Sequence, residues 1–284
     1  MRNIHGSGLG WRRDLADFRD HTVESTAVKK ILAKSAAKVR AAKKLPATTD
    51  LRAWCSPIED QGHLGSCTAH AGVGMFEYFE RRAHGKYLDA SRLFLYKVTR
   101  QLEGVSGDEG ATLRETMKAM VLFGVPPEQY WPYEVARFDA EPTSFCFSFA
   151  QNYQAVEYFR LDPPGTSATE LLAAIKRQLA AGLPAMFGFS VYSCIPGPGD
   201  GHGDIPLPKS GDSLQGGHAV LAVGYDDNHK IGSEQGALLI RNSWGKNWGE
   251  QGYGWLPYAY VAHGLASDFW SMVKAEYVDT ELFK

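Results

Sequence analysis

The sequence has few cysteines and no long apolar run, and each absence excludes a class of protein. Its 284 residues include four cysteines, too few for a disulfide scaffold of this size, and no pair has the C-x-x-C spacing typical of zinc sites. No stretch approaches 18 uncharged apolar residues, so no membrane-spanning helix is expected. Residues 1–6 contain no apolar signal-peptide core. We therefore expect a protein that is cytoplasmic or exported by a non-Sec route, with the compartment itself left open.

The net charge is only −2, but the charges are unevenly distributed. Residues 1–46 contain eleven Lys/Arg and four Asp/Glu, whereas the remainder contains nineteen and twenty-eight. A basic segment joined to an acidic body favours an N-terminal arm that folds back on the rest of the chain. A solvated basic helix and a tail that binds nucleic acid or membrane are the alternatives. We expect no nucleic-acid partner.

The sequence pattern changes near Leu45, from a basic helical segment to turns and short strands. Residues 1–25 are polar and predicted to be irregular, and residues 26–44 are predicted to form a helix that Pro46 ends. The apolar stripe of this helix has no local partner; it comprises Val28, Ile31, Leu32, Ser35 and Val39.

The body begins with helical patterns and continues with strand patterns. Helices are predicted over about 67–84, 91–101, 112–123 and 167–181, with Ser66 as N-cap of the first. Apolar runs over 184–189, 219–223 and 237–240 predict buried strands. Between them, residues 195–215 are rich in Gly, Pro and Asp and predict an irregular surface loop. The spacing of Asp200, His202 and Asp204 suggests a metal site less strongly than it suggests a solvated loop.

Three segments carry side chains that point to chemistry. Cys67 lies at the first turn of a predicted helix, where the helix dipole and free N–H groups favour a thiolate. His218 follows two glycines at the start of a strand, and Asn242 follows another strand directly before paired Trp-Gly units. Taken singly, each has an ordinary interpretation: a buried cysteine, a core histidine and a turn asparagine.

Taken together, the segments are much more specific. Their order is Cys, His, Asn, with separations of 151 and 24 residues, and the third reads Asn-Ser-Trp-Gly-x-x-Trp-Gly-x-x-Gly-Tyr. From about Leu45 to Trp270 the chain resembles the papain-like cysteine peptidases, as a divergent, bacterial-type member with a short N-terminal pro-segment.

The resemblance implies an α+β fold of two lobes with the active-site cleft between them. Residues 1–44 would be the pro-segment and residues 45–284 the peptidase domain. The domain would comprise a helical lobe over about 45–150 and a β-barrel-like lobe over about 151–284.

The resemblance also implies catalytic roles, none of which needs a metal or other cofactor. Cys67 would attack the scissile carbonyl as a thiolate paired with the His218 imidazolium, and Asn242 would orient the ring. Gln61 would stabilise the oxyanion together with the Cys67 backbone N–H. Trp244 would shield the His218–Asn242 contact from water.

Substrate contacts are implied at a second set of positions. An acid near Ser267 and Asp268 could admit a basic substrate side chain, and Gly110 matches the glycine stretch that pairs with an extended substrate. The full set expected to bind substrate is Gly110, Ala111, Thr112, Gly216, Gly217, Ala219 and Trp244.

The chain also departs from the family pattern. Leu64 stands where many members have a disulfide cysteine, and Thr68 replaces the usual aromatic residue after the nucleophile. The other cysteines, Cys55, Cys146 and Cys194, fit none of the usual bridges. A reducing compartment or a divergent member would explain this.

We therefore expect a cysteine endopeptidase that acts on protein or peptide substrates through a Cys67 thioacyl intermediate. It would be made as a zymogen and inhibited by its own N-terminal segment, and we expect a monomer. The alternatives are an acyltransferase or transglutaminase-type enzyme, an exopeptidase, and a silent peptide-binding homologue.

Overall fold

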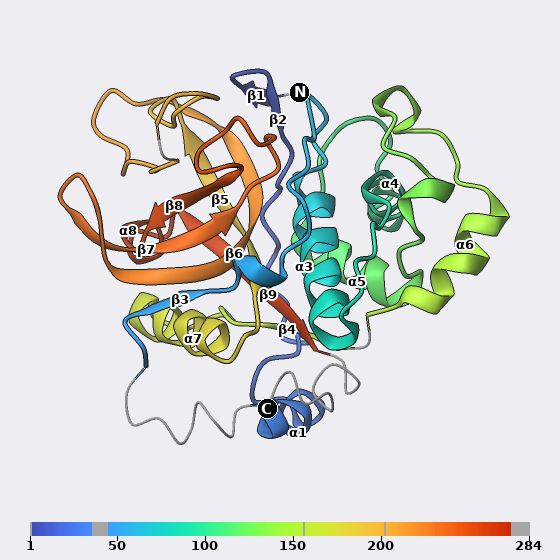
Figure 1. Ribbon diagram of the computed structural model, residues 1–284, viewed down its shortest axis with the longest axis horizontal. Helices are drawn as coiled ribbons and strands as arrows, with labels where there is room; N and C mark the ends of the chain where they lie inside the picture. The colour runs from blue at the N-terminus through green and yellow to red at the C-terminus, as the bar shows by residue number, and fades with distance from the viewer. Residues whose placement is uncertain (1, 36–44, 156, 202, 274–284) are drawn as a thin grey trace.

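A twisted antiparallel sheet and a group of helices stand side by side, and the N-terminal segment runs between them (Figure 1). The structure is a computed structural model that describes residues 2–35, 45–155, 157–201 and 203–273. The arm descends from the N-terminus at the top of the view to helix α1 at the bottom. This arrangement confirms the α+β class with two dissimilar halves.

The helical half is organised around α3, which is buried along most of its length because helices cover one side and the sheet the other. Thr112 caps α5 by accepting a hydrogen bond from the Glu115 backbone, and Ser91 caps α4 in the same way through Phe94. The helices are α1 (Thr26–Ser35), α3 (Cys67–His84), α4 (Arg92–Leu102), α5 (Leu113–Leu122), α6 (Ser144–Ala150), α7 (Ala168–Ala180) and α8 (Ala259–Ala262). Short 3-10 turns are η1 (Arg52–Trp54), η2 (Glu128–Tyr130), η3 (Val135–Arg137) and η4 (Gln151–Tyr153).

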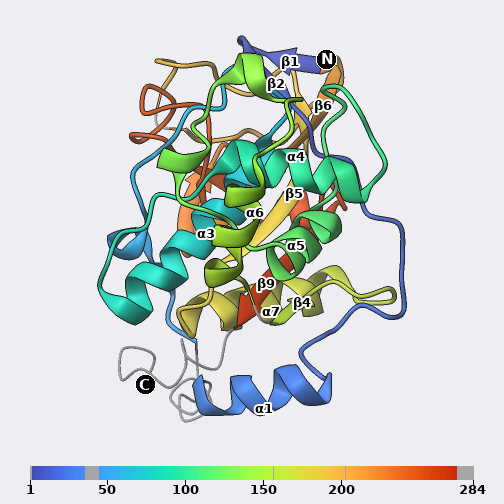
Figure 2. The same cartoon turned by 90° about the vertical axis from the view of Figure 1, so that its right-hand side faces the viewer.

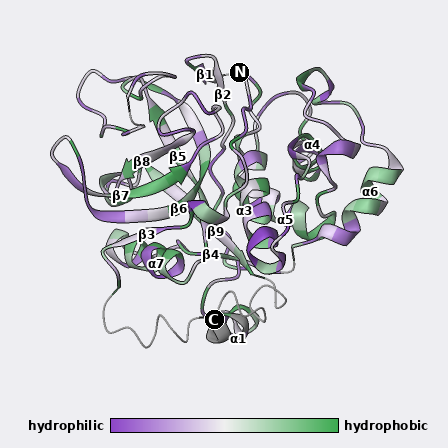
Figure 3. Cartoon of the chain, viewed as in Figure 1, coloured by the Kyte–Doolittle hydropathy of each residue, from purple (hydrophilic) through white to green (hydrophobic). Residues whose placement is uncertain are grey.

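The other half is a seven-stranded sheet with the order β4-β9-β5-β6-β7-β8, to which β3 is added alongside β6. Its central strands are buried on both faces, which is why they read as continuous apolar runs in the sequence (Figure 3). The strands are β3 (Thr48–Asp50), β4 (Glu157–Arg160), β5 (Ala185–Tyr192), β6 (Leu214–Ile231), β7 (Glu234–Arg241), β8 (Tyr253–Pro257) and β9 (Ala266–Val273). Pairing of β5 with β6 sets Phe189 opposite His218.

The beginning of the chain is more ordered than its polar sequence suggests. Strands β1 (Arg2–Ile4) and β2 (Ser7–Leu9) form a hairpin, so the prediction of an irregular segment there was wrong. His5 and Gly6 both have positive φ, 50° and 83°, as a tight two-residue hairpin turn requires. The hairpin escaped prediction because its strands are only three residues long, too short to show an alternating pattern in the sequence.

Helix α1 lies at the bottom of the molecule, as the side view in Figure 2 shows. It contacts β4 and β9, and Val28 of the predicted apolar stripe is fully buried there. The predicted continuation of this helix to residue 44, including Val39, lies outside the described residues.

Most predicted elements of the body are present, with small differences at their ends. The strand predicted over 219–223 is the exception: β6 extends from Leu214 to Ile231 and takes up the end of the loop predicted over 195–215. Ser66 occupies the N-cap position of α3, but its hydroxyl makes no capping hydrogen bond, so the predicted cap was wrong in its chemistry. Among the described residues, no helix is long and apolar enough to cross a membrane.

Candidate active site

Cys67 is the first residue of α3 and is fully buried. Its thiol lies against backbone N–H groups of Ala219, Gly10 and Thr68, all of which favour its anion. Ala219 directly follows His218 on β6, so the start of α3 meets this strand at the predicted base. The structure thus brings the predicted nucleophile and the strand that bears the predicted base together across the two halves.

His218 is held by a hydrogen bond of 2.7 Å between its Nε2 atom and Oδ1 of Asn242. Because an amide oxygen only accepts, Nε2 carries the proton, and Nδ1 is left with its lone pair. No partner for Nδ1 is present among the described residues. The free nitrogen is therefore the one that can exchange a proton with a thiol.

Trp244 covers this pair. Its indole stacks on the His218 ring with centroids 4.5 Å apart. Trp248 packs edge-on against the Trp244 indole, with centroids 5.5 Å apart. Trp244 is 4% exposed and Asn242 is 4% exposed. A hydrogen bond shielded from water in this way is electrostatically stronger than an exposed one, which fixes the orientation of the ring.

Hydrogen bonds hold the carboxamide of Gln61 in one orientation. The Ser243 hydroxyl donates to Gln61 Oε1 at 2.6 Å, and the Gln61 backbone N–H donates to the Ser243 carbonyl at 2.9 Å. Consequently the Nε2 group points inward, where it donates to the carbonyls of Leu64 and Gly8 at 2.8 and 3.1 Å. Because Ser243 follows Asn242, one short segment orients both the base and the amide donor.

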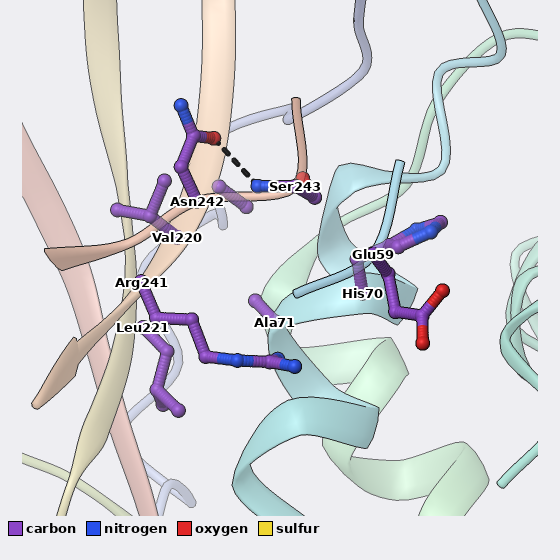
Figure 4. Close-up of a pocket in the computed structure, with 9 residues that line it drawn as sticks. Glu59, His70, Ala71, Val220, Leu221, Arg241, Asn242 and Ser243 are labelled. Atoms are coloured by element: carbon purple, nitrogen blue, oxygen red, sulfur yellow. Dashed lines mark hydrogen bonds between the residues drawn. The ribbon is translucent and has the colours of Figure 1, made fainter. Parts of the chain in front are cut away.

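A small cavity lies behind Asn242, between the end of β7 and α3 (Figure 4). Its volume is about 10 Å³, roughly the room of one water molecule. Arg241 extends from the strand toward α3, where a Cβ atom on Gly74 would lie 2.0 Å from its Nη1. Arg241 also donates to the Pro57 carbonyl at 2.6 Å, so this side chain ties the end of β7, directly before Asn242, to the helical half.

The N-terminal arm passes through this site as an extended chain. Its main chain is hydrogen-bonded to the body on both sides: Gly8 N donates to Gly62 O at 2.9 Å, and Trp11 N donates to Gly217 O at 3.1 Å. Ala111 N donates to Gly10 O at 2.8 Å. The predicted substrate positions Ala111 and Gly217 therefore hold an extended peptide in this structure, and that peptide belongs to the same chain.

Glycines allow the arm to approach so closely. A Cβ atom on Gly110, which has φ 71°, would lie 2.0 Å from Gly10 O. The Trp11 indole fills a space where a Cβ atom on Gly188 would lie 1.9 Å from its ring. On the other side, a Cβ atom on Gly217 would lie 2.7 Å from the ring. Gly188 is not among the predicted positions, since a glycine within an apolar strand gives no sign of what it accommodates.

The other predicted substrate positions are placed as follows. The Thr112 hydroxyl caps α5 and donates to Glu103 at 2.7 Å, so its hydrogen bonds are made within the protein. Gly216 pairs with Val191 on the neighbouring strand. Their roles in binding substrate stay predictions.

Burial changes the acid–base state of Cys67 and His218. Burial raises the pKa of the Cys67 thiol to about 11, against the opposing effect of nearby N–H groups. Burial also lowers the pKa of His218 to about 4, although its bond to Asn242 acts in the other direction. In this covered state the thiol and the imidazole are therefore both neutral at pH 7, whereas the family resemblance implies an ion pair.

A buried cluster of charges anchors the arm beyond Trp11. Asp14 accepts a hydrogen bond from the Trp270 indole at 2.8 Å, and its backbone N–H donates to Asp268 at 2.8 Å. Asp268 in turn accepts from Arg160 at 2.6 Å. Asp268, the acid expected to admit a basic substrate side chain, thus already forms an ion pair with Arg160. Burial and the neighbouring Asp268 raise the pKa of Asp14 to about 7.

Comparison with known proteins agrees with this geometry. Residues 45–270 match the family model described as papain family cysteine protease. An uncharacterized peptidase C1-like protein of Acanthamoeba polyphaga mimivirus is 38% identical over 216 residues, which cover 74% of this chain and 68% of that protein. Chymopapain of Carica papaya is 28% identical over 202 residues, 70% of this chain and half of that protein.

Solved structures show the same fold. The crystal structure of xylellain, a cysteine protease from Xylella fastidiosa, is 36% identical and superposes with a TM-score of 0.75 over 96% of this chain and 99% of that one. Digestive procathepsin L 3 of Tenebrio molitor superposes with a TM-score of 0.64 at 19% identity, over 95% of this chain and 76% of that one, and supports the fold alone. The chain therefore belongs to the papain family of cysteine proteases.

Proposed function

We propose that this peptidase is an endopeptidase in which Cys67, His218, Asn242 and Gln61 form the catalytic group. The observation that carries the proposal is the path of the arm, which enters the cleft beside Gln61, crosses Cys67 and leaves toward Asp14 on the far side. An extended chain thus continues on both sides of the nucleophile. A cleft open at both ends suits internal bonds of a substrate, whereas an exopeptidase needs one end closed.

The chemistry follows from the free atoms of the site. The proton of the Cys67 thiol passes to His218 Nδ1, and Sγ bonds to the substrate carbonyl carbon. Gln61 Nε2 and the Cys67 N–H would stabilise the resulting oxyanion. The imidazolium protonates the leaving amine, and the neutral ring then activates a water that hydrolyses the thioester. Asn242 keeps the ring in the required tautomer throughout.

The arm is proposed to inhibit the site before activation. It places the N–H of Gly10 against the Cys67 thiol and so covers the nucleophile. The arm pairs with the segment around Ala111 as a parallel strand would, through a bridge between Trp11 and Ala111. The Gly8 carbonyl accepts a hydrogen bond from the Gln61 amide and so uses the donor proposed for the oxyanion. A peptide bound in this manner blocks the cleft without being cut. The fold shared with digestive procathepsin L 3 of Tenebrio molitor, which is named as a proform, supports the proposal at the level of the fold.

The ion pair implied by the resemblance would then form only when the arm leaves. Water entering the cleft removes the burial that holds Cys67 and His218 neutral, and the helix N-terminus favours the thiolate. The arm would therefore control both access to the site and the reactivity of the nucleophile.

A peptide-library profile tests the proposed reaction. A chain beginning at Leu45 should release new free carboxyl termini from internal positions of the peptides, and the same chain carrying Cys67→Ala should release none. Amine adducts in place of free carboxyl termini would instead indicate acyl transfer. Removal of terminal residues alone would indicate an exopeptidase, and equal cleavage by the Cys67→Ala chain would exclude the mechanism.

A further inference from the structure

Tyr133 lies outside the proposed catalytic group but contacts both peptide segments that supply its oxyanion donors. Its hydroxyl donates to the Gln61 backbone carbonyl at 3.0 Å. The same oxygen lies 2.6 Å from the hydroxyl of Ser66, the residue directly before Cys67. One phenol oxygen thus joins the two ends of the loop that separates Gln61 from the start of α3.

The direction of these hydrogen bonds can be assigned. A carbonyl oxygen only accepts, so the single Tyr133 proton is used on Gln61, and the Ser66 hydroxyl must be the donor in the second bond. Burial raises the pKa of Tyr133 above its usual value, so the phenol keeps its proton at neutral pH. The arrangement is a chain of donors that runs from Ser66 through Tyr133 to Gln61.

The contact also explains why Ser66 does not cap its helix. Serine at this position ordinarily accepts a hydrogen bond from a first-turn N–H group, yet no such bond is present. The hydroxyl is directed to Tyr133 instead, while the His70 ring donates through Nδ1 to the Ser66 carbonyl at 3.1 Å. An uncapped helix start leaves its N–H groups free to face a ligand oxygen.

The surroundings hold Tyr133 in place. The Tyr133 backbone N–H donates to Glu128 at 2.5 Å, and its ring packs edge-on against His70 with centroids 4.9 Å apart. Arg92 lies over the ring at 5.8 Å and is itself paired with Glu128 at 2.9 Å. The hydroxyl is therefore presented from a fixed ring rather than from a freely rotating one.

We infer that Tyr133 is a positioning residue for the oxyanion site, which sets the distance between the Gln61 amide and the N-terminus of α3. This inference rests on the proposed function. Because oxyanion donors act only when they point at the developing charge, a displacement of either segment should reduce the rate of the chemical step more than substrate binding.

The test uses the full chain with Gly10→Val, which prevents the arm from docking because a Cβ atom at Gly10 would lie 1.9 Å from the Gly65 carbonyl oxygen. In this background Tyr133→Phe removes only the hydroxyl. We expect kcat for peptide hydrolysis to fall about tenfold, since misplacement of about 1 Å can cost about 100-fold. KM should change less than about twofold, because the oxyanion forms only in the transition state and substrate binding does not depend on its donors. The matched control is Tyr130→Phe, which removes a hydroxyl from a tyrosine three residues earlier and should leave both constants unchanged.

Two further measurements separate positioning from a general structural effect. A peptide aldehyde, which forms a tetrahedral adduct with an oxyanion, should bind Tyr133→Phe about tenfold more weakly, in proportion to kcat. Alkylation of Cys67 by iodoacetamide needs no oxyanion donor, so its rate and pH profile should be unchanged. Unchanged kcat, or alkylation that falls together with kcat, would overturn the inference. A Gly10→Val chain that does not hydrolyse peptides while its Cys67 is still alkylated would instead contradict the proposed function.

Discussion

The segments of the proposed catalytic group and the N-terminal arm meet at one site, but they are held there by different kinds of contact. The catalytic segments are fixed through side chains, as in the bonds from His218 to Asn242 and from Ser243 to Gln61. The arm is fixed mainly through its backbone, which bonds to Gly62 and Gly217 and requires close approach. The rate of hydrolysis should therefore be sensitive to the loss of single side chains. Docking of the arm should instead be sensitive to a side chain added at a glycine and to the few buried side chains, such as Asp14, that hold the arm.

The arm itself shows the same contrast along its length. Asp14 is buried, but the next stretch turns outward, with Leu15 84% and Phe18 97% exposed. Contacts with the body resume at Asp20, which pairs with Arg114, so the exposed residues between Asp14 and Asp20 offer controls that lie on the same segment.

The largest effect in this comparison is expected on the catalytic side. In a chain that begins at Leu45, Gln61→Ala removes the side-chain oxyanion donor and should lower kcat by about 100- to 1,000-fold. Steady-state hydrolysis of a peptide substrate measures this. A loss of less than about tenfold would mean that the Cys67 N–H suffices alone.

On the arm side, Gly10→Val should raise the peptidase activity of the full chain by about 100-fold. The added side chain would meet the Gly65 carbonyl, and Gly65 is held by its N–H bond to Asp108 at 3.0 Å, so the arm has to move. Losing two or three backbone hydrogen bonds of about 1 kcal/mol each gives this magnitude. Leu15→Ala is the control and should leave the activity near that of the unmodified chain. Equal activities of all three chains would show that the arm does not inhibit.

An effect of pH is expected through the anchor of the arm. The pKa of Asp14 is raised from 3.8 to about 7 when the arm is docked, so docking favours the protonated carboxyl. Docking is then strongest below about pH 4 and weakens as the pH rises toward 7. The charged neighbours are Arg160, Arg114, Asp268, Asp162 and Asp20.

The measured quantity is the activity of the full chain divided by that of a chain beginning at Leu45. This ratio should rise between pH 4 and 7 by up to about 1,000-fold, since the pKa of Asp14 differs by about three units between the docked and free arm and each unit corresponds to a factor of ten. Asp14→Asn should give a ratio that varies little over the same window. A ratio that falls as the pH rises would contradict the expected weakening of docking.

The sequence allowed the fold class and the position of the site to be predicted because their signals are local. Cys67 at a helix start, His218 after two glycines and the Asn242-Ser243-Trp244 run can each be recognised within a few neighbouring residues. The α+β class and several element boundaries followed from periodicity in the same way.

What escaped prediction depends on contacts between residues far apart in the chain. Asp14 meets Asp268 across 254 positions, and Tyr133 meets Gln61 across 72. Neither pairing leaves a pattern in the surrounding sequence. The position of the arm over Cys67 was inferred only from charge asymmetry, although the structure holds it largely by backbone bonds and glycines that net charge does not reveal.

The central claim is that the arm covers a neutral Cys67, and the alkylation rate of this thiol tests it most directly. The full chain and a chain beginning at Leu45 would be treated with iodoacetamide at pH 7, and modification at Cys67 would be followed by mass spectrometry of its peptide. We expect the shorter chain to react at least about tenfold faster, because removing the arm exposes the thiol and lowers its pKa by at least about one unit. Equal rates in the two chains would contradict the account.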